Sequence, residues 1–218
     1  MGNREDAYRH KGMRQKLVDG LVKKGIKSKA VLEAINAVPR HFFLDSALDK
    51  IAYKDQAFDI HCGQTISMPY TVAMQSELLE IKKMDKVLEV GTGSAYQATI
   101  LAELGAQVYT IERQEGLYKE VQNTYPFKKR YPFIKFFFGD GYKGLPTYGP
   151  FDKIIITAGA PFIPEDLVHQ LKPNGILVVP VDNGDAQIMT RIKKGPKGGI
   201  KKETFGDCSF VPMLKGTE

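Results

Sequence analysis

The sequence predicts an α/β fold: a mostly parallel sheet with helices on both faces, an N-terminal helical extension and a C-terminal antiparallel edge hairpin. Short apolar runs alternate with helical periodicity between residues 86 and 192, which is the pattern of βαβ units. Before residue 40 the apolar residues recur at helical spacing instead. Near the C-terminus a Gly-Pro-Lys-Gly-Gly segment, residues 195–199, separates two polar strands, as in a hairpin.

The N-terminal part predicts a pair of amphipathic helices between residues 6 and 38. Lys24-Gly25 is a typical C-terminal stop for the first helix, and Ser28 is placed to cap the second. Pro39 should end the second helix, because proline cannot continue one.

The stretch 52–69 is rich in Gly, Asp, Gln and Ser and has no clear period. We expect a long ordered loop here, and such loops in compact domains are often functional. Thr71 is expected to cap a helix that runs to about Ile81.

The remainder of the chain predicts an alternating series, in which the last helix ends near Pro173-Asn174-Gly175. Strands are expected at 86–90, 107–112, 134–139, 153–158, 176–181 and 187–192, and helices at 96–104, 114–125 and 164–171.

Composition limits the class of protein. Hydrophobic residues make up 43% and charged residues 26% of the 218 positions, which excludes a disordered or collagen-like chain. Two cysteines are too few for a disulfide scaffold and suit a reducing compartment. Residues 1–6 lack the apolar core of a signal peptide, and no apolar run has membrane-spanning length. We therefore expect a cytoplasmic monomer without a membrane segment.

One domain is expected over residues 1–218. It would comprise N-terminal helices with the long loop (1–81), a ligand-binding core (82–192) and an edge segment (193–218). The formal charge of +6 permits attraction to anions but does not demonstrate it. Four scattered histidines have no metal-ligand spacing, so no metal site is expected.

The strongest local motif is a glycine turn between a buried strand and a helix. Val90 leads into Gly91-Thr92-Gly93, where glycine lets the chain turn tightly and lets a ligand approach the main chain. Glu112 ends the next strand, at the distance from Gly91 where a carboxylate accepts hydrogen bonds from ribose hydroxyls. Strand, turn, helix and acid in register predict a Rossmann-like nucleoside site.

Two details indicate which nucleoside binds. A dinucleotide fingerprint would place glycine where this chain has Tyr96. Glu89, two residues before the first glycine, would repel a pyrophosphate but suits a ligand with an ammonium or sulfonium group. S-adenosylmethionine carries both groups, so we expect a methyltransferase sheet that uses this cofactor. Glu89 could instead brace the glycine turn, and the two roles are compatible.

Further acids and their neighbours complete the predicted cofactor site. Asp140, in Gly139-Asp140-Gly141 after the third strand, lies where an adenine amine should reach, although it could equally be an ordinary turn residue. Gly141 beside it, and Arg113 beside Glu112, are included in the predicted site. The fourth strand ends in Thr157-Ala158-Gly159-Ala160-Pro161, small residues that leave room for an extended backbone or a carboxylate and weigh against a nucleic-acid substrate.

At this point the chain resembles the protein-L-isoaspartate O-methyltransferase family, whose members methylate the stray carboxyl group of isoaspartyl residues in aged proteins. The resemblance covers nearly the whole length. Its most specific parts are the segment 38–42, Val-Pro-Arg-His-Phe, and the loop 63–69, Gly-Gln-Thr-Ile-Ser-Met-Pro. Supporting matches lie at 25–26, 31–32, 52–55, 87–93, 139–141, 149–152 and 210–212.

The chain departs from the family pattern at two places. The third glycine of the turn is replaced by Ala95, which is tolerable if its φ is negative. The stretch 58–61, Phe-Asp-Ile-His, replaces positions where the family usually has proline and glycine. This second difference leaves the course of the loop before Gly63 open.

The resemblance implies an active-site role for Ser67. A carboxylate is already ionised at neutral pH, so we expect Ser67 to orient it by donating a hydrogen bond rather than to act as a nucleophile. A simple cap at the next helix is the alternative. Ile66, Met68 and Pro69 would form the wall over the cofactor. Thr65, Ala158, Pro161 and Val211 would line a groove for isoaspartyl peptides and proteins, with D-aspartyl residues as a second possible acceptor.

Two other functions stay open on the sequence alone. An RNA or small-molecule methyltransferase would use the basic segment 191–202, although no aromatic residues interleave with its charges, as expected of a solvated hairpin tip. The other alternative is a cofactor-binding subunit without catalytic activity. The intact loop that contains Ser67 argues against it. His61 beside Cys62 lacks a third partner in the sequence and is expected to be a packed or solvent-facing pair.

Overall fold

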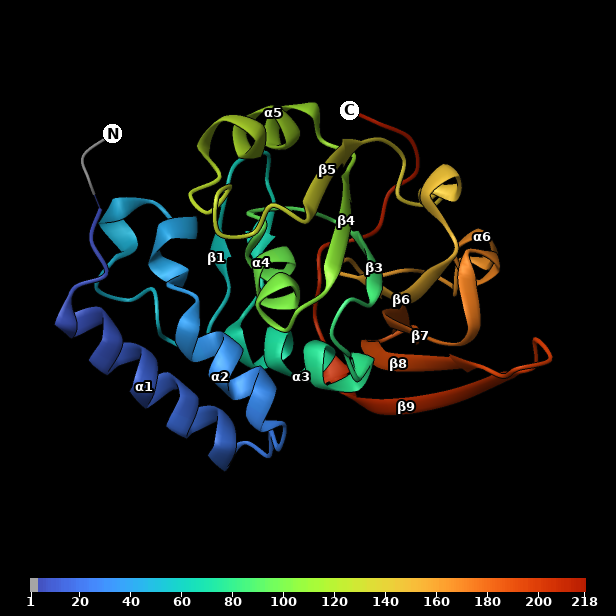
Figure 1. Ribbon diagram of the computed structural model, residues 1–218, viewed down its shortest axis with the longest axis horizontal. Coiled ribbons are helices and arrows are strands. Elements are labelled where there is room, and N and C mark those ends of the chain that lie inside the picture. The colour runs from blue at the N-terminus through green and yellow to red at the C-terminus, as the bar shows by residue number, and fades with distance from the viewer. Residues whose placement is uncertain (1–3) are drawn as a thin grey trace.

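The computed structural model describes residues 4–218 and contains the predicted sheet between helical layers (Figure 1). Residues 1–3, part of the segment in which no signal peptide was expected, lie outside the described range. The helices are α1 Tyr8–Lys23, α2 Lys29–Ala37, α3 Pro69–Leu79, α4 Tyr96–Glu103, α5 Glu115–Thr124 and α6 Glu165–His169, with short 3-10 helices η1 Arg40–Phe43, η2 Ser46–Leu48 and η3 Pro146–Tyr148. The strands are β1 Phe58–Asp59, β2 Thr65–Ile66, β3 Lys86–Val90, β4 Gln107–Glu112, β5 Ile134–Phe138, β6 Phe151–Ile156, β7 Leu171–Asp182, β8 Gln187–Lys194 and β9 Ile200–Cys208.

The main sheet has the strand order β5-β4-β3-β6-β7-β8-β9. The first five strands in this order run parallel, and β8 and β9 add to the edge in antiparallel fashion. The chain moves outward from β3 to β5 and then returns to place β6 on the other side of β3. This reversal makes a switch point at the carboxyl ends of β3 and β6, where open α/β sheets bind ligands.

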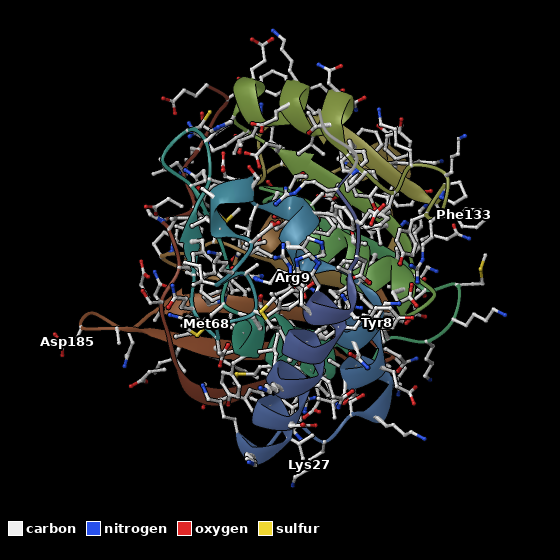
Figure 2. All side chains as sticks on the ribbon, turned by 90° about the vertical axis from the view of Figure 1, so that its left-hand side faces the viewer. Tyr8, Arg9, Lys27, Met68, Phe133 and Asp185 are labelled. Carbon is white, nitrogen blue, oxygen red and sulfur yellow. The ribbon has the colours of Figure 1, made fainter. Side chains whose placement is uncertain are left out.

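Apolar side chains pack on both faces of the sheet. One cluster joins α1, α2, α3 and α4 to the sheet, with Leu21 and Ile35 of the helical pair fully buried in it. The other cluster lies under α6 and includes Leu88 and Leu167. Because the N-terminal pair shares the first cluster, it is a layer of the core (Figures 1 and 2).

The ends of the N-terminal helices follow the predicted chemistry. Gly25 stops α1 with a φ of +98°, a conformation that only glycine adopts readily. The Ser28 hydroxyl accepts the Val31 backbone N–H at 3.4 Å and caps α2.

Several predicted boundaries are wrong, three of them at the start of an element. Helix α3 begins at Pro69 rather than after Thr71, because proline is well suited to the first helical position. Strand β6 begins at Phe151, and β7 begins at Leu171, so that Pro173-Asn174-Gly175 lie inside a strand rather than at the end of a helix. Pairing of Phe151 with Leu171 extends the two strands through a register irregularity.

The C-terminal edge hairpin is confirmed. Strands β8 and β9 pair on either side of the turn at 195–199, closed by the Gly195 N–H and the Gly199 carbonyl at 2.6 Å. The preceding β7–β8 turn projects from the body, with Asp185 at its tip (Figure 2). Within residues 4–218, no helix combines the length and apolar character needed to cross a membrane.

Candidate active site

A cavity lies at the switch point, where the substrate loop, the glycine turn and a C-terminal strand-like segment converge. We call residues 52–68 the substrate loop, after the role that the sequence leads us to expect for them. Most predicted site residues line the cavity together, whereas Met68, Pro69, Glu89, Asp140 and Pro161 lie outside its lining. The lining comprises Gln64–Ser67, Val72, Val90–Ser94, Tyr96, Gln97, Ile111–Gln114, Gly141, Thr157, Ala158 and Val211–Leu214.

The glycine turn requires glycine at its first position. Gly91 has a φ of +100°, and a Cβ there would stand 2.4 Å from the Thr157 Oγ1. The Thr157 hydroxyl in turn lies within hydrogen-bond distance of the carbonyls of Val90 (2.9 Å) and Gly91 (2.7 Å). The residue that follows β6 therefore holds the turn in place, and Gly91 and Gly93, which have no side chains, line the cavity.

Glu112 is positioned by the turn that it faces. Its Oε2 accepts the Gly93 N–H at 3.0 Å, and its Oε1 accepts the Gln114 N–H at 3.0 Å. The residue is 5% exposed and lines the cavity. Each carboxylate oxygen can accept a second hydrogen bond, so Glu112 is oriented and still able to receive hydroxyl donors.

Ala95 differs from expectation. Its φ is +65°, in the left-handed region, and its side chain is fully buried at the N-cap of α4. An L-residue there is strained by roughly 1–2 kcal/mol relative to glycine. The condition set for Ala95 from the sequence, a negative φ, is therefore not met. The turn keeps the geometry that glycine would adopt although alanine occupies the position.

Glu89 does not face the cavity. It is fully buried, pairs in register with Thr110 of β4, and lies on the sheet face that carries Val87 and the α4 cluster. Neither of its carboxyl oxygens has a hydrogen-bond partner among the described residues. Burial, with a smaller contribution from the Glu112 charge, raises the pKa of Glu89 to about 8. This placement gives no direct contact for a ligand.

Asp140 behaves as a turn residue. Its Oδ1 accepts the Tyr142 backbone N–H at 2.9 Å, and it lies outside the cavity lining. Gly141 does line the cavity, and a Cβ on it would stand 2.5 Å from the Val90 side chain. The turn after β5 therefore contributes the backbone of Gly141 to the cavity lining, and the predicted carboxylate of Asp140 lies outside it.

The substrate loop contains a short hairpin that was not predicted. Strands β1 and β2 pair antiparallel, and the Ile60 N–H donates to the Gln64 carbonyl at 2.8 Å across the turn. Two-residue strands are too short for periodicity to reveal them. The hairpin brings Thr65 and Ile66 to the cavity wall.

Ser67 lines the cavity and does not cap a helix. The N-cap of α3 is Met68, which is 37% exposed (labelled in Figure 2), and Pro69 occupies the first helical position. The Ser67 hydroxyl makes no hydrogen bond to another residue in the part of the chain that the structure describes. Its donor and acceptor capacity therefore remains free at the cavity.

The Val-Pro-Arg-His-Phe segment holds the start of the substrate loop. Arg40 is fully buried, its guanidinium lies 4.9 Å from the Tyr96 ring, and its Nη2 is 3.5 Å from the Gln56 carbonyl. Burial lowers the Arg40 pKa to about 10, so the side chain stays charged at neutral pH. Because Tyr96 lines the cavity, the segment connects the helical layer to both the loop and the cofactor side.

The C-terminal segment forms the opposite rim. The Gly159 N–H donates to the Val211 carbonyl at 2.8 Å, and the Met213 N–H donates to the Gly159 carbonyl at 2.7 Å. Ala158 and Val211 both line the cavity, as predicted, but Pro161 is exposed outside it. The Gln187 side chain binds the Phe210 backbone twice. Its Oε1 accepts the Phe210 N–H at 2.7 Å, and its Nε2 donates to the Phe210 carbonyl at 3.2 Å.

The chain then runs on toward the start of α5 (Figure 1). The Glu218 side chain pairs with Arg113 at 3.0 Å, and the Glu218 carbonyl accepts the Glu115 N–H at 2.7 Å. Arg113 lines the cavity, but its guanidinium is committed to this contact. We therefore regard Arg113 as a support of the cavity rim.

Several lining residues were missed. Thr157 could have been noticed as a polar residue at the end of a buried strand. Gln97 lies on α4 and bonds Ser76, while its Oε1 is buried without a partner among the described residues. Gln114 lies two residues after Glu112 and could have been included with it. Met213 and Leu214 come to the cavity through contacts of the C-terminal segment, such as that of the Met213 N–H with the Gly159 carbonyl, which no local pattern predicts.

The structure brings two of the scattered histidines together. Asp6, His10 and His41 have ligand atoms within 4.8 Å of one another. The two imidazole rings, however, stack with centroids 3.9 Å apart and planes at 26°, so no nearby point lies in both ring planes. Arg14 already binds both Asp6 oxygens at 3.0 Å. This geometry does not suit a tetrahedral metal site.

The basic segment 191–202 is not simply a solvated tip. The Arg191 side chain is 14% exposed, pairs with Glu80 and Glu203, and lies over the Phe205 ring. Lys193 also pairs with Glu80 at 2.8 Å. Two carboxylates, Glu80 and Glu203, therefore offset part of the positive charge of this segment.

Comparison with known proteins agrees with this site. The family model described as protein-L-isoaspartate(D-aspartate) O-methyltransferase matches residues 12–218. Curated relatives named protein-L-isoaspartate O-methyltransferase include one from Flavobacterium johnsoniae, 52% identical over 97% of this chain and 98% of its own length. Another, from Christiangramia forsetii, is 54% identical with the same coverage.

Solved structures give the same result for the fold. A Plasmodium falciparum protein described as a protein-L-isoaspartate O-methyltransferase in complex with S-adenosyl-L-homocysteine superposes with a TM-score of 0.78 at 26% identity, over 93% of this chain and 98% of that one. A second structure of that name has a TM-score of 0.80 at 26% identity, over 91% and 65% of the two chains. The present chain belongs to the protein-L-isoaspartate(D-aspartate) O-methyltransferase family.

Proposed function

We propose that the protein transfers the methyl group of S-adenosylmethionine to the free carboxylate of L-isoaspartyl residues in damaged proteins. The observation that carries this proposal is the meeting of two halves in one cavity. Glu112 and the glycine turn line one side, and the unengaged hydroxyl of Ser67 lines another. A donor site and an acceptor site are thus adjacent.

The residues present fit the nucleoside part of the cofactor. Gly91, Gly93 and Gly141 expose backbone to the cavity, and at Gly91 and Gly141 a Cβ would collide with the wall behind. Glu112 would accept the ribose hydroxyls, which its hydrogen bonds to the turn orient it to do. When bound, S-adenosylmethionine supplies an electrophilic methyl group on a sulfonium.

Ser67 is proposed to orient the substrate. An isoaspartyl carboxylate has a pKa near 4 in water and is ionised at neutral pH, so no general base is required. A hydrogen bond from Ser67 would hold one carboxylate oxygen while the other faces the methyl group. Holding reactants in line can supply roughly 7–11 kcal/mol of the barrier reduction.

The opposite rim is proposed to bind the peptide. In an isoaspartyl residue the main chain continues through the side chain, and the α-carboxylate is left free. Ala158 and Gly159 carry little or no side chain, which leaves room for such an extended branch, and Val211 closes the groove above them. Polar groups of the backbone would read the peptide without demanding particular side chains.

The remaining predictions are also carried forward as proposals. We propose that residues 1–218 form one domain, supported by the contacts of the tail with Arg113 and of the N-terminal helices with the common core. We further propose a monomer that acts in the cytoplasm without a nucleic-acid partner. Two unpaired cysteines, Cys62 and Cys208, suit a reducing compartment.

The test uses labelled S-adenosylmethionine and three acceptors: an isoaspartyl peptide, its normal aspartyl twin and RNA. Base-labile label on the isoaspartyl peptide alone is expected, because carboxyl methyl esters hydrolyse in base. Label on RNA would favour the RNA methyltransferase instead. No transfer to any acceptor, with cofactor bound, would favour a binding subunit without catalysis.

A further inference from the structure

The tip of the substrate loop is fastened to α5. The His61 Nδ1 lies 2.6 Å from the Glu120 Oε2, although the residues are 59 positions apart. The next residue, Cys62, places its Sγ 3.1 Å from where a Cβ on Gly116 of α5 would stand. The tip and the helix therefore approach so closely that a larger residue at Gly116 would crowd the sulfur.

This contact joins the two halves of the cavity. His61 precedes Ser67 in the substrate loop, and Glu120 lies on the helix that follows Glu112 and Gln114. The Ile60 side chain, next to His61, stands 3.6 Å from the Cβ position on Gly93. The hairpin tip thus passes beside the glycine turn and reaches α5 beyond it.

The pair can form in either protonation state of the histidine. A neutral imidazole can donate its Nδ1 proton to the carboxylate, and a protonated one adds the attraction of opposite charges. Glu120 is the one carboxylate with an oxygen within 4.0 Å of a His61 ring nitrogen in residues 4–218.

We propose that His61 and Glu120 form a latch that holds the substrate loop closed over the bound cofactor. Both are positioning residues, since they act through the loop that carries Ser67. His61 lies in the stretch where the chain departs from its family's usual proline and glycine. The inference rests on the proposed function, because it requires the cavity to bind S-adenosylmethionine.

The experiment measures the dissociation constant and the dissociation rate of S-adenosyl-L-homocysteine. The variants are His61→Gln, Glu120→Gln, the double variant, and His61→Lys, which can still pair with Glu120. His169→Gln, an exposed histidine of α6 outside the cavity lining, is the matched control.

The parent and the control should bind about two- to fivefold more tightly than His61→Gln does, as for an exposed ion pair. The double variant should be no weaker than either single one, and His61→Lys should bind as tightly as the parent. Equal affinity and dissociation rate in parent and His61→Gln, or additive single effects, would overturn the latch and leave the methyl transfer standing. Failure of the parent to bind the ligand would overturn the proposed function instead.

Discussion

The glycine turn and the substrate loop line the same cavity but are built differently. The turn is held by buried parallel strands, with Gly91 fixed against Thr157 and Gly93 against Glu112. The loop has strands of only two residues and is held by distant contacts, from Arg40 at its start and from Glu120 at its tip. The cofactor side is therefore specified by local backbone geometry, and the substrate side by tertiary contacts.

Gly91→Ala should have the largest effect, because it changes the glycine turn itself, which buried strands hold in one conformation. The φ of +100° and the 2.4 Å approach to Thr157 together should cost about 3 kcal/mol, so cofactor affinity should fall roughly 100-fold or more. Isothermal titration with S-adenosyl-L-homocysteine checks this. Gly20→Ala, in α1 with open space around its Cβ, is the control and should slightly stabilise the fold. Unaltered affinity in Gly91→Ala would show that the turn is adaptable.

Glu112→Ala should come next and should separate the two halves. Loss of hydrogen bonds to a charged acceptor costs about 1.5–3 kcal/mol, so the dissociation constant for the cofactor should rise about 10- to 100-fold. The KM for an isoaspartyl peptide at saturating cofactor should change little. Glu33→Ala, an exposed acid of α2, controls for the loss of a negative charge. A normal cofactor titration would remove the ribose role of Glu112.

Glu89→Gln tests, through pH, how the burial of the Glu89 carboxyl group affects stability. Burial raises the Glu89 pKa from 4.5 to about 8, so its contribution to stability is present below pH 4.5 and is lost as pH rises through 8. The glutamine variant has no such loss. Its free energy of unfolding relative to the parent should therefore rise between pH 5 and pH 8 by about 1.4 kcal/mol or more, the value of one pKa unit. Denaturant titrations at several pH values measure this, and a flat difference would contradict it.

Ala95→Gly should have the smallest effect. Relief of left-handed strain, about 1–2 kcal/mol, is offset by the loss of a buried methyl group and by the greater chain entropy of glycine. The free energy of unfolding should stay within about 1 kcal/mol of the parent value. Destabilisation by more than about 2 kcal/mol would mean that the Ala95 methyl group is required for packing.

The same contrast explains what could be predicted from the sequence. The strands that carry the glycine turn, β3 and β4, have the predicted bounds because apolar runs and turn residues mark both of their ends. The start of β7 was wrong, because pairing with β6 draws polar residues such as Lys172 into a strand. Such pairing is set by a distant segment, and a local pattern does not contain it.

The candidate site shows a similar division. Gly91, Gly93 and Glu112 were found from spacing, whereas Ser67 was assigned an active-site role only with the help of a family resemblance. Glu89 was expected to face the ligand, but the alternation of side chains along β3 directs it to the α4 face. Met213 and Leu214 reach the cavity through the contact of the Met213 N–H with the distant Gly159 carbonyl, which spacing cannot show.

The central claim is that the glycine turn binds the cofactor and the substrate loop orients the substrate. Its most direct test is Ser67→Ala, studied by steady-state kinetics on an isoaspartyl peptide together with a cofactor titration. Turnover should fall about 10- to 100-fold, the value of one hydrogen bond to a charged group, while the dissociation constant for S-adenosylmethionine changes less than about twofold. Ser46→Ala, in η2 away from the cavity lining, serves as the control. Equal turnover in Ser67→Ala and parent, or a loss confined to cofactor binding, would contradict the account.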